Sequence, residues 1–308
     1  MSSENFARRT WPQGKAVAQA GFSPDGRRVA VSGTTEFARV YDAETGALLG
    51  EPLAHPAPGV KAGWLDDRRL ATFDAFSVFR IWDTTSGQLL SSNAIPKATG
   101  FFSGRHFIAL RPGRAAELWD AATGQRRFEM AVEPGEYPVV RADLRHFLSV
   151  RGREVRVRDA ETGADVHPKF QLDHSAWPVA LNADSTRVAV RHGESTVAIW
   201  NPATGRRVAG PLTHTAAIRT AAFTADGRVL ATVSADRSLR LWDAATGEPL
   251  GPPLWHPGYV MDISIRADGR SFATAGSDGS ARVWEVPPFA ASAEEMARIA
   301  RRLNGKTE

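Results

Sequence analysis

Short runs of alternating or β-branched apolar residues, separated by small polar turns, occur along most of the chain. In the segment 220–243, three such runs follow one another, at Thr220–Phe223, Arg228–Val233 and Ser238–Trp242. Asp, Gly or Ser residues bound each run, which is typical of short strands. The pattern therefore predicts three consecutive antiparallel strands, the last of which closes on Leu241-Trp242-Asp243.

This unit occurs seven times along the chain. The closing triplets are Val40-Tyr41-Asp42, Ile81-Trp82-Asp83, Leu118-Trp119-Asp120, Val157-Arg158-Asp159, Ile199-Trp200-Asn201, Leu241-Trp242-Asp243 and Val283-Trp284-Glu285. Their last residues are 41, 37, 39, 42, 42 and 42 positions apart. Six triplets lead into a turn whose glycine supplies the positive φ of a tight hairpin, at Gly46, Gly87, Gly124, Gly163, Gly205 and Gly247. A period near 42 predicts one repeat architecture rather than two unrelated domains.

A fourth run in the units carries prolines, at Pro52, Pro211 and Pro252-Pro253. Because proline cannot donate a hydrogen bond to a sheet, this run is predicted to be an outer edge strand. The first run holds small residues such as Ala216 and Ala217, which suit the crowded centre of a radial array. A single four-stranded sheet cannot bury both of its faces, so the units are expected to stack around an axis.

Three features together resemble the tryptophan–aspartate (WD) repeat family of β-propellers: the period near 42, a histidine before the first strand, and Trp-Asp closing the third. The resemblance covers about residues 4–286. It implies an all-β, seven-bladed β-propeller of four-stranded antiparallel blades, formed by residues 1–288. It also implies that Glu4–Trp11 supplies the outer strand of the last blade, because the seventh unit runs into Val286-Pro287-Pro288.

The last segment, 289–308, has a different pattern. A capping box at Ser292–Glu295 precedes apolar residues at helical spacing, Met296, Ile299, Ala300 and Leu303. We expect a short amphipathic C-terminal helix, which must dock on the propeller, on a partner or on the rest of a longer chain, because it is too short to be stable alone. This tail is similar to the ends of bacterial multidomain WD-repeat proteins.

Two units carry His, Thr, Asp and Trp at matching offsets. These sets are His214, Thr232, Asp236 and Trp242, and His256, Thr274, Asp278 and Trp284. Hydroxyl, imidazole and carboxylate could suggest a hydrolase, but the hydroxyl lies in mid-strand, with no nucleophile elbow and no oxyanion donors. In the family, the set resembles a structural tetrad of hydrogen-bonded side chains, and we interpret it as one.

The remaining units depart from this set. In the second, Phe76 stands at the Asp position; in the fifth, Val190 and Glu194 stand at the hydroxyl and Asp positions, while His174 and Trp200 are kept. The first unit has Tyr41 and no His, the third keeps only Trp119, and the fourth has Arg158 in place of Trp. We expect the third and fourth blades to be the least regular, either looser or adapted to a partner.

Composition and charge limit the function classes. The chain has no cysteine, which excludes disulfides, and no metal-ligand spacing, phosphate loop or Rossmann glycines, so we predict no metal and no cofactor. Its net charge of +4 is too small for a strong nucleic-acid footprint. No secretion signal or membrane span is evident, so a cytoplasmic location is expected. The excess of Arg over Lys, with many Ala, is typical of a GC-rich bacterial source.

An arginine cluster occupies the fourth unit, at Arg141, Arg145, Arg151, Arg153, Arg156 and Arg158. It is either a solvated outer face or a site for an acidic protein or a phosphate, with which Arg forms bidentate pairs. No aromatic residues interleave with it, so it gives no support to single-strand nucleic-acid binding.

Exposed aromatic and basic residues are predicted at one rim of the ring. By the resemblance, positions three and five after the His slot face the narrow face, where partners commonly bind. We expect Trp177, Arg219, Tyr259 and Met261 to form one patch across units five to seven, with Tyr137 in the fourth unit as a further contact. The alternative is that Trp177 and Tyr259 only close the mouth of the central channel.

These observations favour a non-catalytic, monomeric propeller that acts as a protein-interaction scaffold within a complex and binds a partner protein or peptide. The alternatives are a regulatory module of a larger bacterial signalling protein, favoured if Met296, Ile299 and Leu303 are exposed, and a propeller hydrolase or lactonase. The latter needs several inward acidic groups, and the inner strands offer mainly Asp262 and Glu136.

Overall fold

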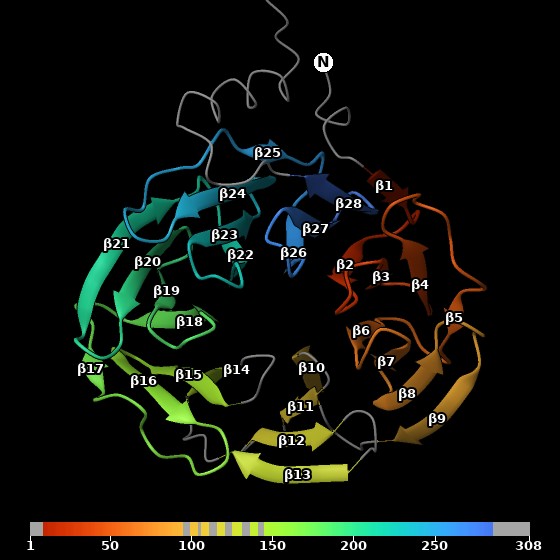
Figure 1. Ribbon diagram of the computed structural model, residues 1–308, viewed down its shortest axis with the longest axis horizontal. Coiled ribbons are helices and arrows are strands. Elements are labelled where there is room, and N and C mark those ends of the chain that lie inside the picture. The colour runs from red at the N-terminus through yellow and green to blue at the C-terminus, as the bar shows by residue number, and fades with distance from the viewer. Residues whose placement is uncertain are drawn as a thin grey trace, which may run out of the picture.

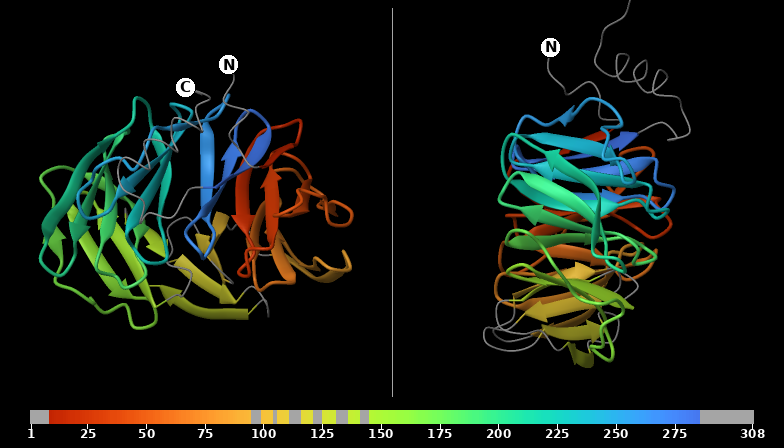
Figure 2. Two further views of the ribbon diagram at one scale, coloured as in Figure 1. Left: turned by 45° about the horizontal axis from the view of Figure 1, so that its top comes forward. Right: turned by 90° about the vertical axis from the view of Figure 1, so that its left-hand side faces the viewer.

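The computed structural model describes residues 9–94, 99–103, 106–110, 116–120, 125–130, 136–140 and 145–285. These residues form 28 strands in seven four-stranded antiparallel sheets, which stand around a central opening (Figure 1). Seen from its side, the molecule is a flat ring (Figure 2). The predicted all-β, seven-bladed propeller is confirmed, and each sheet is one blade.

The first four blades follow the chain order from the centre outward. Blade 1 contains β2 (Val17–Phe22), β3 (Arg28–Gly33), β4 (Phe37–Asp42) and β5 (Leu53–Ala54). Blade 2 contains β6 (Lys61–Trp64), β7 (Arg69–Phe73), β8 (Val78–Asp83) and β9 (Leu89–Ala94). Blade 3 contains β10 (Thr99–Ser103), β11 (His106–Leu110), β12 (Ala116–Asp120) and β13 (Gln125–Met130). Blade 4 contains β14 (Tyr137–Val140), β15 (His146–Arg151), β16 (Glu154–Asp159) and β17 (Phe170–Gln171).

The last three blades complete the ring. Blade 5 contains β18 (Ala176–Leu181), β19 (Val188–His192), β20 (Thr196–Asn201) and β21 (Arg206–Thr213). Blade 6 contains β22 (Ile218–Phe223), β23 (Val229–Ser234), β24 (Ser238–Asp243) and β25 (Leu254–Trp255). Blade 7 contains β26 (Val260–Ile265), β27 (Ser271–Gly276) and β28 (Ser280–Glu285), with β1 (Arg9–Pro12) as its outer strand.

The core lies between adjacent blades, and this placement explains the apolar runs. Every residue of β23 and of β27 is buried, because the second strand of a blade packs against a neighbouring blade on each face. One cluster joins Val17 and Val31 of blade 1 to Ala273 and Val283 of blade 7. At roughly 25 cal/mol per Å² of buried apolar surface, such interfaces supply the main driving force for stacking the blades.

The N-terminal strand closes the ring. β1 pairs antiparallel with β28, with Arg9 opposite Val283 and Pro12 opposite Ser280. Trp11 is buried, stacks on Tyr41 of blade 1 with ring centroids 5.0 Å apart, and donates its indole N–H to the Gly46 carbonyl at 2.9 Å. β1 therefore ties the last blade to the first, as expected. Of the predicted strand Glu4–Trp11, residues 4–8 lie outside the described residues.

Hairpin turns between the first and second strands pack edge to edge around the ring. A Cβ on Gly26 of blade 1 would lie 2.6 Å from Arg266 Nε of blade 7, and one on Gly227 of blade 6 would lie 3.0 Å from Asn182 Nδ2 of blade 5. Both glycines have a φ of 69°. Glycine is therefore required twice over at each turn, for its conformation and for the close approach of the next blade.

The expected C-terminal helix within 289–308 lies outside the described residues. Over the residues that are described, no helix has the length and apolar character needed to cross a membrane.

Candidate interaction surface

The four predicted residues of blade 6 form one hydrogen-bonded chain. His214 Nδ1 lies 2.8 Å from Asp236 Oδ2, and its Nε2 lies 2.8 Å from Thr232 Oγ1, which also accepts the indole N–H of Trp242 at 2.8 Å. With Asp236 ionised, Nδ1–H donates to the carboxylate and Nε2 accepts the Thr232 hydroxyl. Each of these polar groups thus has a partner, and none is left free to act as a nucleophile or a base.

Burial keeps this histidine neutral. Burial lowers the pKa of His214, and nearby Arg240 lowers it further, against the opposing effect of Asp236. Burial alone would raise the pKa of Asp236, but hydrogen bonds from Ser238, Thr215 and His214 outweigh it, and the pKa falls to about 2. The pair is therefore a neutral imidazole and a carboxylate, which is the state that the hydrogen-bond chain requires.

Blade 7 uses the same residue types differently. Arg282 is buried, and its Nη1 donates hydrogen bonds to Asp278 Oδ2 at 2.7 Å and to His256 Nδ1 at 2.6 Å. Since a guanidinium only donates, His256 accepts at Nδ1 and donates from Nε2 to Thr274 Oγ1 at 2.7 Å. This is the opposite tautomer to His214, and Asp278 reaches the histidine only through the arginine.

Sequence reasoning missed the carboxylate of blade 2. The position expected for Asp is Phe76, but Asp74, two residues after Thr72 in the chain, contacts His55 at 3.1 Å between Oδ2 and Nδ1. His55 Nε2 and Trp82 Nε1 both contact Thr72 Oγ1. In blade 2 the carboxylate is therefore at the end of the second strand, whereas in blade 6 it is at the hairpin tip. The tip position of blade 2 is held by Phe76, which is 70% exposed.

Blade 1 replaces the histidine with an amide. Gln13 stands four residues before the buried Val17, as His214 stands four before Ile218. Its Nε2 donates to the Tyr41 hydroxyl at 2.8 Å, and its Oε1 accepts from Arg39 at 2.9 Å. The spacing to the first residue of the inner strand was the signal that could have found it.

Blade 4 replaces the tetrad with a buried ion pair. Arg158 is bonded to Glu136 and donates to Ser149 Oγ at 3.2 Å, with its guanidinium over the Phe147 ring. The expectation that Arg158 belongs to a surface cluster is wrong, because the side chain is buried at the tryptophan position. Glu136 is committed to this pair and is not available to a catalytic channel.

The other described arginines of this blade are engaged as well. Arg156 forms two hydrogen bonds with Asp165, at 2.9 and 2.8 Å, and Arg153 Nε donates to the Leu172 carbonyl at 2.7 Å. Arg145 and Arg151 also have interactions, and Arg141 lies outside the described residues. Arg153, Arg156 and Arg158 are therefore bound within their own blade.

Blade 5 has an incomplete network. Val190 provides no hydroxyl, His174 is exposed, and the indole N–H of Trp200 is buried with no partner among the described residues. His192 Nδ1 is also buried and has no hydrogen-bond partner among the described residues. The pair His174 and Trp200, kept in the sequence, is thus not joined in the structure.

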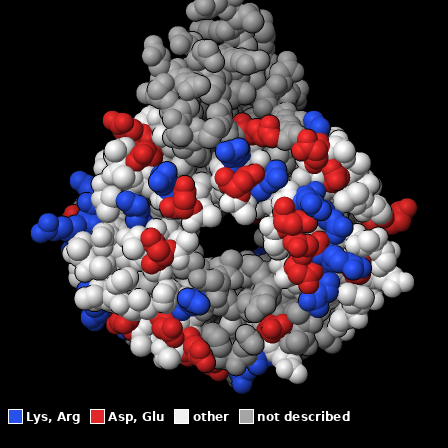
Figure 3. All heavy atoms as spheres, viewed as in Figure 1, with Lys and Arg blue, Asp and Glu red and all other residues white. Residues whose placement is uncertain are grey.

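Three of the predicted rim residues lie at the start of the inner strands of consecutive blades. Trp177, Arg219 and Met261 are each the second residue of an inner strand, directly after the buried Ala176, Ile218 and Val260. Strands β18, β22 and β26 pack side by side along the central opening (Figure 1). Figure 3 shows that this opening is hollow at its centre.

Exposure distinguishes the members of this set. Trp177 is 42% exposed and Tyr259, just before β26, is 51% exposed; Arg219 is exposed and Met261 is half-buried. We call Trp177, Arg219, Tyr259 and Met261 the rim patch. Tyr137 begins β14 in blade 4, two blades from β22, and its side chain lies outside the described part.

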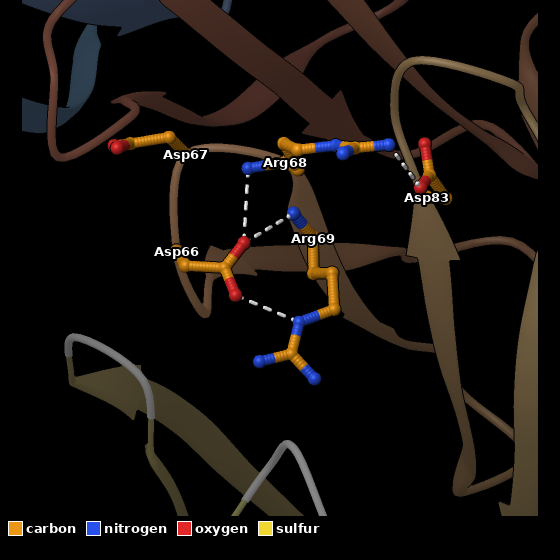
Figure 4. A pocket seen from close by; sticks show the side chains of 5 residues that line it. All are labelled: Asp66, Asp67, Arg68, Arg69 and Asp83. Atoms are coloured by element: carbon orange, nitrogen blue, oxygen red, sulfur yellow. Dashed lines mark hydrogen bonds and ion pairs between the residues drawn. The ribbon is translucent and has the colours of Figure 1, made fainter.

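A pocket of about 510 Å³ lies in blade 2, lined by Asp66, Asp67, Arg68, Arg69 and Asp83 (Figure 4). Arg69 Nε bonds Asp66 Oδ2 at 2.7 Å, and Arg68 pairs with Asp83 at 3.2 Å. Burial raises the pKa of Asp66, but bonds from the Arg68 and Arg69 amides and the Arg69 side chain bring it below its usual value. Two of the three carboxylates are thus paired with arginine within the pocket, and we assign it no catalytic role.

Across the described residues no group of three or more His, Asp or Glu could hold a metal ion.

Comparison with known proteins agrees with this architecture. The family model described as "WD domain, G-beta repeat" matches residues 207–243 and 249–285, the two units with complete sets of His, Thr, Asp and Trp. No curated protein sequence matches the chain. In all, 1784 chains of solved structures match it, so the fold alone does not select one function.

One similar chain comes from a structure described as "Crystal Structure of Mitotic Checkpoint Complex". It is 18% identical, the match covers 92% of each chain, and the TM-score is 0.71. At this identity, the likeness shows the fold and nothing more specific.

Proposed function

Because this chain is a WD40-repeat β-propeller, we propose that it is a non-catalytic interaction scaffold that binds a partner protein or peptide at the rim patch. The observation that carries the proposal is the exposure of Trp177 and Tyr259 near the same end of β18 and β26, the two inner strands that flank β22. Large aromatic side chains with arginine and methionine beside them are the residue types enriched at the centres of interfaces.

The hydroxyl, imidazole and carboxylate groups support a structural rather than a catalytic role. In blades 2, 6 and 7 each threonine hydroxyl contacts both an indole N–H and a histidine nitrogen. The similar chain of known structure belongs to a protein assembly, and a role within a complex fits the same picture. We further propose that the chain acts in the cytoplasm as a single propeller.

The test is affinity capture from a lysate of the source organism. The wild-type chain is compared with Trp177→Ala/Tyr259→Ala and with a matched control, Phe76→Ala/Trp255→Ala, which removes two exposed aromatic side chains outside the rim patch. Melting curves first establish that all three are folded. We expect a protein that wild type and control retain and the rim variant loses.

Equal retention by the rim variant would place the partner elsewhere on the ring. Failure of the wild type to retain any protein would contradict the scaffold proposal.

A further inference from the structure

Arg191 organises the rim patch at the junction of blades 5 and 6. It lies opposite Trp177 in the β18–β19 ladder, and its guanidinium carbon is 5.4 Å from the centroid of the Trp177 ring. Its Nη1 donates to the Ile218 carbonyl, on the inner strand of the next blade, at 2.7 Å. The indole is therefore held in place by a side chain that is itself fixed across the junction.

Arg219 brings a second positive charge to this point. It is the residue after Ile218, and its side chain is exposed and forms no hydrogen bond or ion pair with any described residue. The backbone carbonyl to which Arg191 donates is thus one residue away from Arg219. Two arginines and an exposed indole thus stand on strands that come together at this junction.

Neither arginine has a carboxylate partner among the described residues. Arginines on the third strands of other blades are paired: Arg156 with Asp165, Arg240 with Asp236, and Arg282 with Asp278. The acidic residues of blade 5 at this end of the ring, Asp173 and Glu194, are exposed, and neither forms an ion pair with Arg191 or Arg219.

The half-buried Arg191 is therefore not neutralised. Its Nε is buried with no hydrogen-bond partner within the described structure. A buried or half-buried charge without a counter-charge costs free energy, and an incoming carboxylate would remove that cost.

We propose that this junction binds an acidic segment of the partner, with an Asp or Glu carboxylate accepting hydrogen bonds from Arg191 and Arg219 while a neighbouring apolar residue packs on Trp177. Guanidinium groups bind carboxylates in planar, charge-assisted pairs. The inference rests on the proposed function and adds the chemical class of the partner.

The test starts from a display library of random 12-residue peptides selected on the immobilised full chain. Enriched peptides are synthesised and titrated against wild type, Arg219→Gln and the control Arg228→Gln. Arg228 has a side chain that is 82% exposed and stands in the turn between β22 and β23, at the other end of the blade from Arg219. We expect peptides with at least one Asp or Glu, an affinity loss of about tenfold or more for Arg219→Gln, and about the wild-type affinity for Arg228→Gln.

The other outcomes separate this inference from the proposed function. Peptides without acidic residues that still require Trp177 would overturn the acidic assignment and leave the rim patch as the binding surface. Peptides that bind Trp177→Ala/Tyr259→Ala unchanged, or no enrichment over a bare support, would overturn both. Tighter binding when phosphoserine replaces the acidic residue would reassign the junction to a phosphopeptide.

Discussion

The indole of Trp200 is buried without an acceptor in the described structure, whereas those of Trp82, Trp242 and Trp284 each donate to a threonine. In each of those three blades, the threonine lies opposite the residue two positions before the tryptophan, and in blade 5 that place is held by Val190. The empty hydroxyl position explains the unpaired group.

Val190→Thr is therefore expected to stabilise the protein. The new hydroxyl would accept the Trp200 N–H and donate to the Ala198 carbonyl opposite, raising the free energy of unfolding by about 1 kcal/mol. Urea denaturation measures the change. Val197→Thr is the matched control. It buries a hydroxyl at a position without an unpaired indole N–H to bond, so it should destabilise the protein. Destabilisation by both variants would contradict the argument.

Asp262 is a half-buried carboxyl on the inner wall of blade 7. It holds the position that Gln19 holds in blade 1, where the longer amide accepts a hydrogen bond from the Ala62 amide of the next blade at 3.0 Å. Burial raises the pKa of Asp262 to about 7, against a smaller lowering by the Ile263 amide. The folded protein thus binds a proton that the unfolded chain releases near pH 4.

Stability should therefore decrease as the pH rises from about 4 to about 7, where the protonated carboxyl is lost. The loss is on the order of 2 kcal/mol, less than the whole shift would give, because part of the side chain remains accessible. Asp262→Asn should remove this contribution, so its melting temperature should exceed that of wild type by more at pH 8 than at pH 5. A difference that does not change with pH would contradict the assignment.

Matched spacing made some residues of the networks predictable and others not. His214, Thr232, Asp236 and Trp242 stand at offsets that recur, so the sequence points to them directly. In blade 2 the carboxylate that contacts the histidine comes from Asp74, at a different position in the chain. In blade 1 the amide of Gln13 takes the place of the histidine. A hydrogen bond requires only a donor and an acceptor in the right place, so different residues can complete it.

The outer strands β5, β17 and β25 are only two residues long, so the outer edge of a blade needs few paired residues. Prolines in and before outer strands were a correct signal of an edge, and the apolar periodicity placed the inner three strands well. The lengths of the outer strands could not be predicted, because edge strands carry few buried side chains to mark them.

β1 is the exception among these edges, since it joins two ends of the ring. Deleting residues 1–12 would expose the edge of β28 and remove the Trp11–Tyr41 stack, so we expect a large drop in melting temperature. In the full chain, Trp11→Ala should cost about 3 kcal/mol, because the indole is buried and hydrogen-bonded. Differential scanning calorimetry of both variants measures this. An unchanged melting temperature would contradict closure by β1.

The ring as a whole was predictable because seven related units leave one way to bury both faces of every sheet. From the sequence, the rim patch can be proposed only as a set of residues. That Arg191 would anchor Trp177 across a blade boundary depends on which strands become neighbours around the axis, and no local pattern contains that information.

Pairing of residues 9–12 with 280–283 also determines the order in which the blades can fold during synthesis. The first strand leaves the ribosome long before its partner exists, and blades 1 to 6 must be made while it stays unpaired. Early blades can form as they emerge, but the last sheet can assemble only after residues 280–283 have been synthesised. A nascent chain that stalls before residue 280 therefore exposes the segment 9–12 without its partner, and this is the stage at which quality-control factors would distinguish an unfinished ring from a closed one.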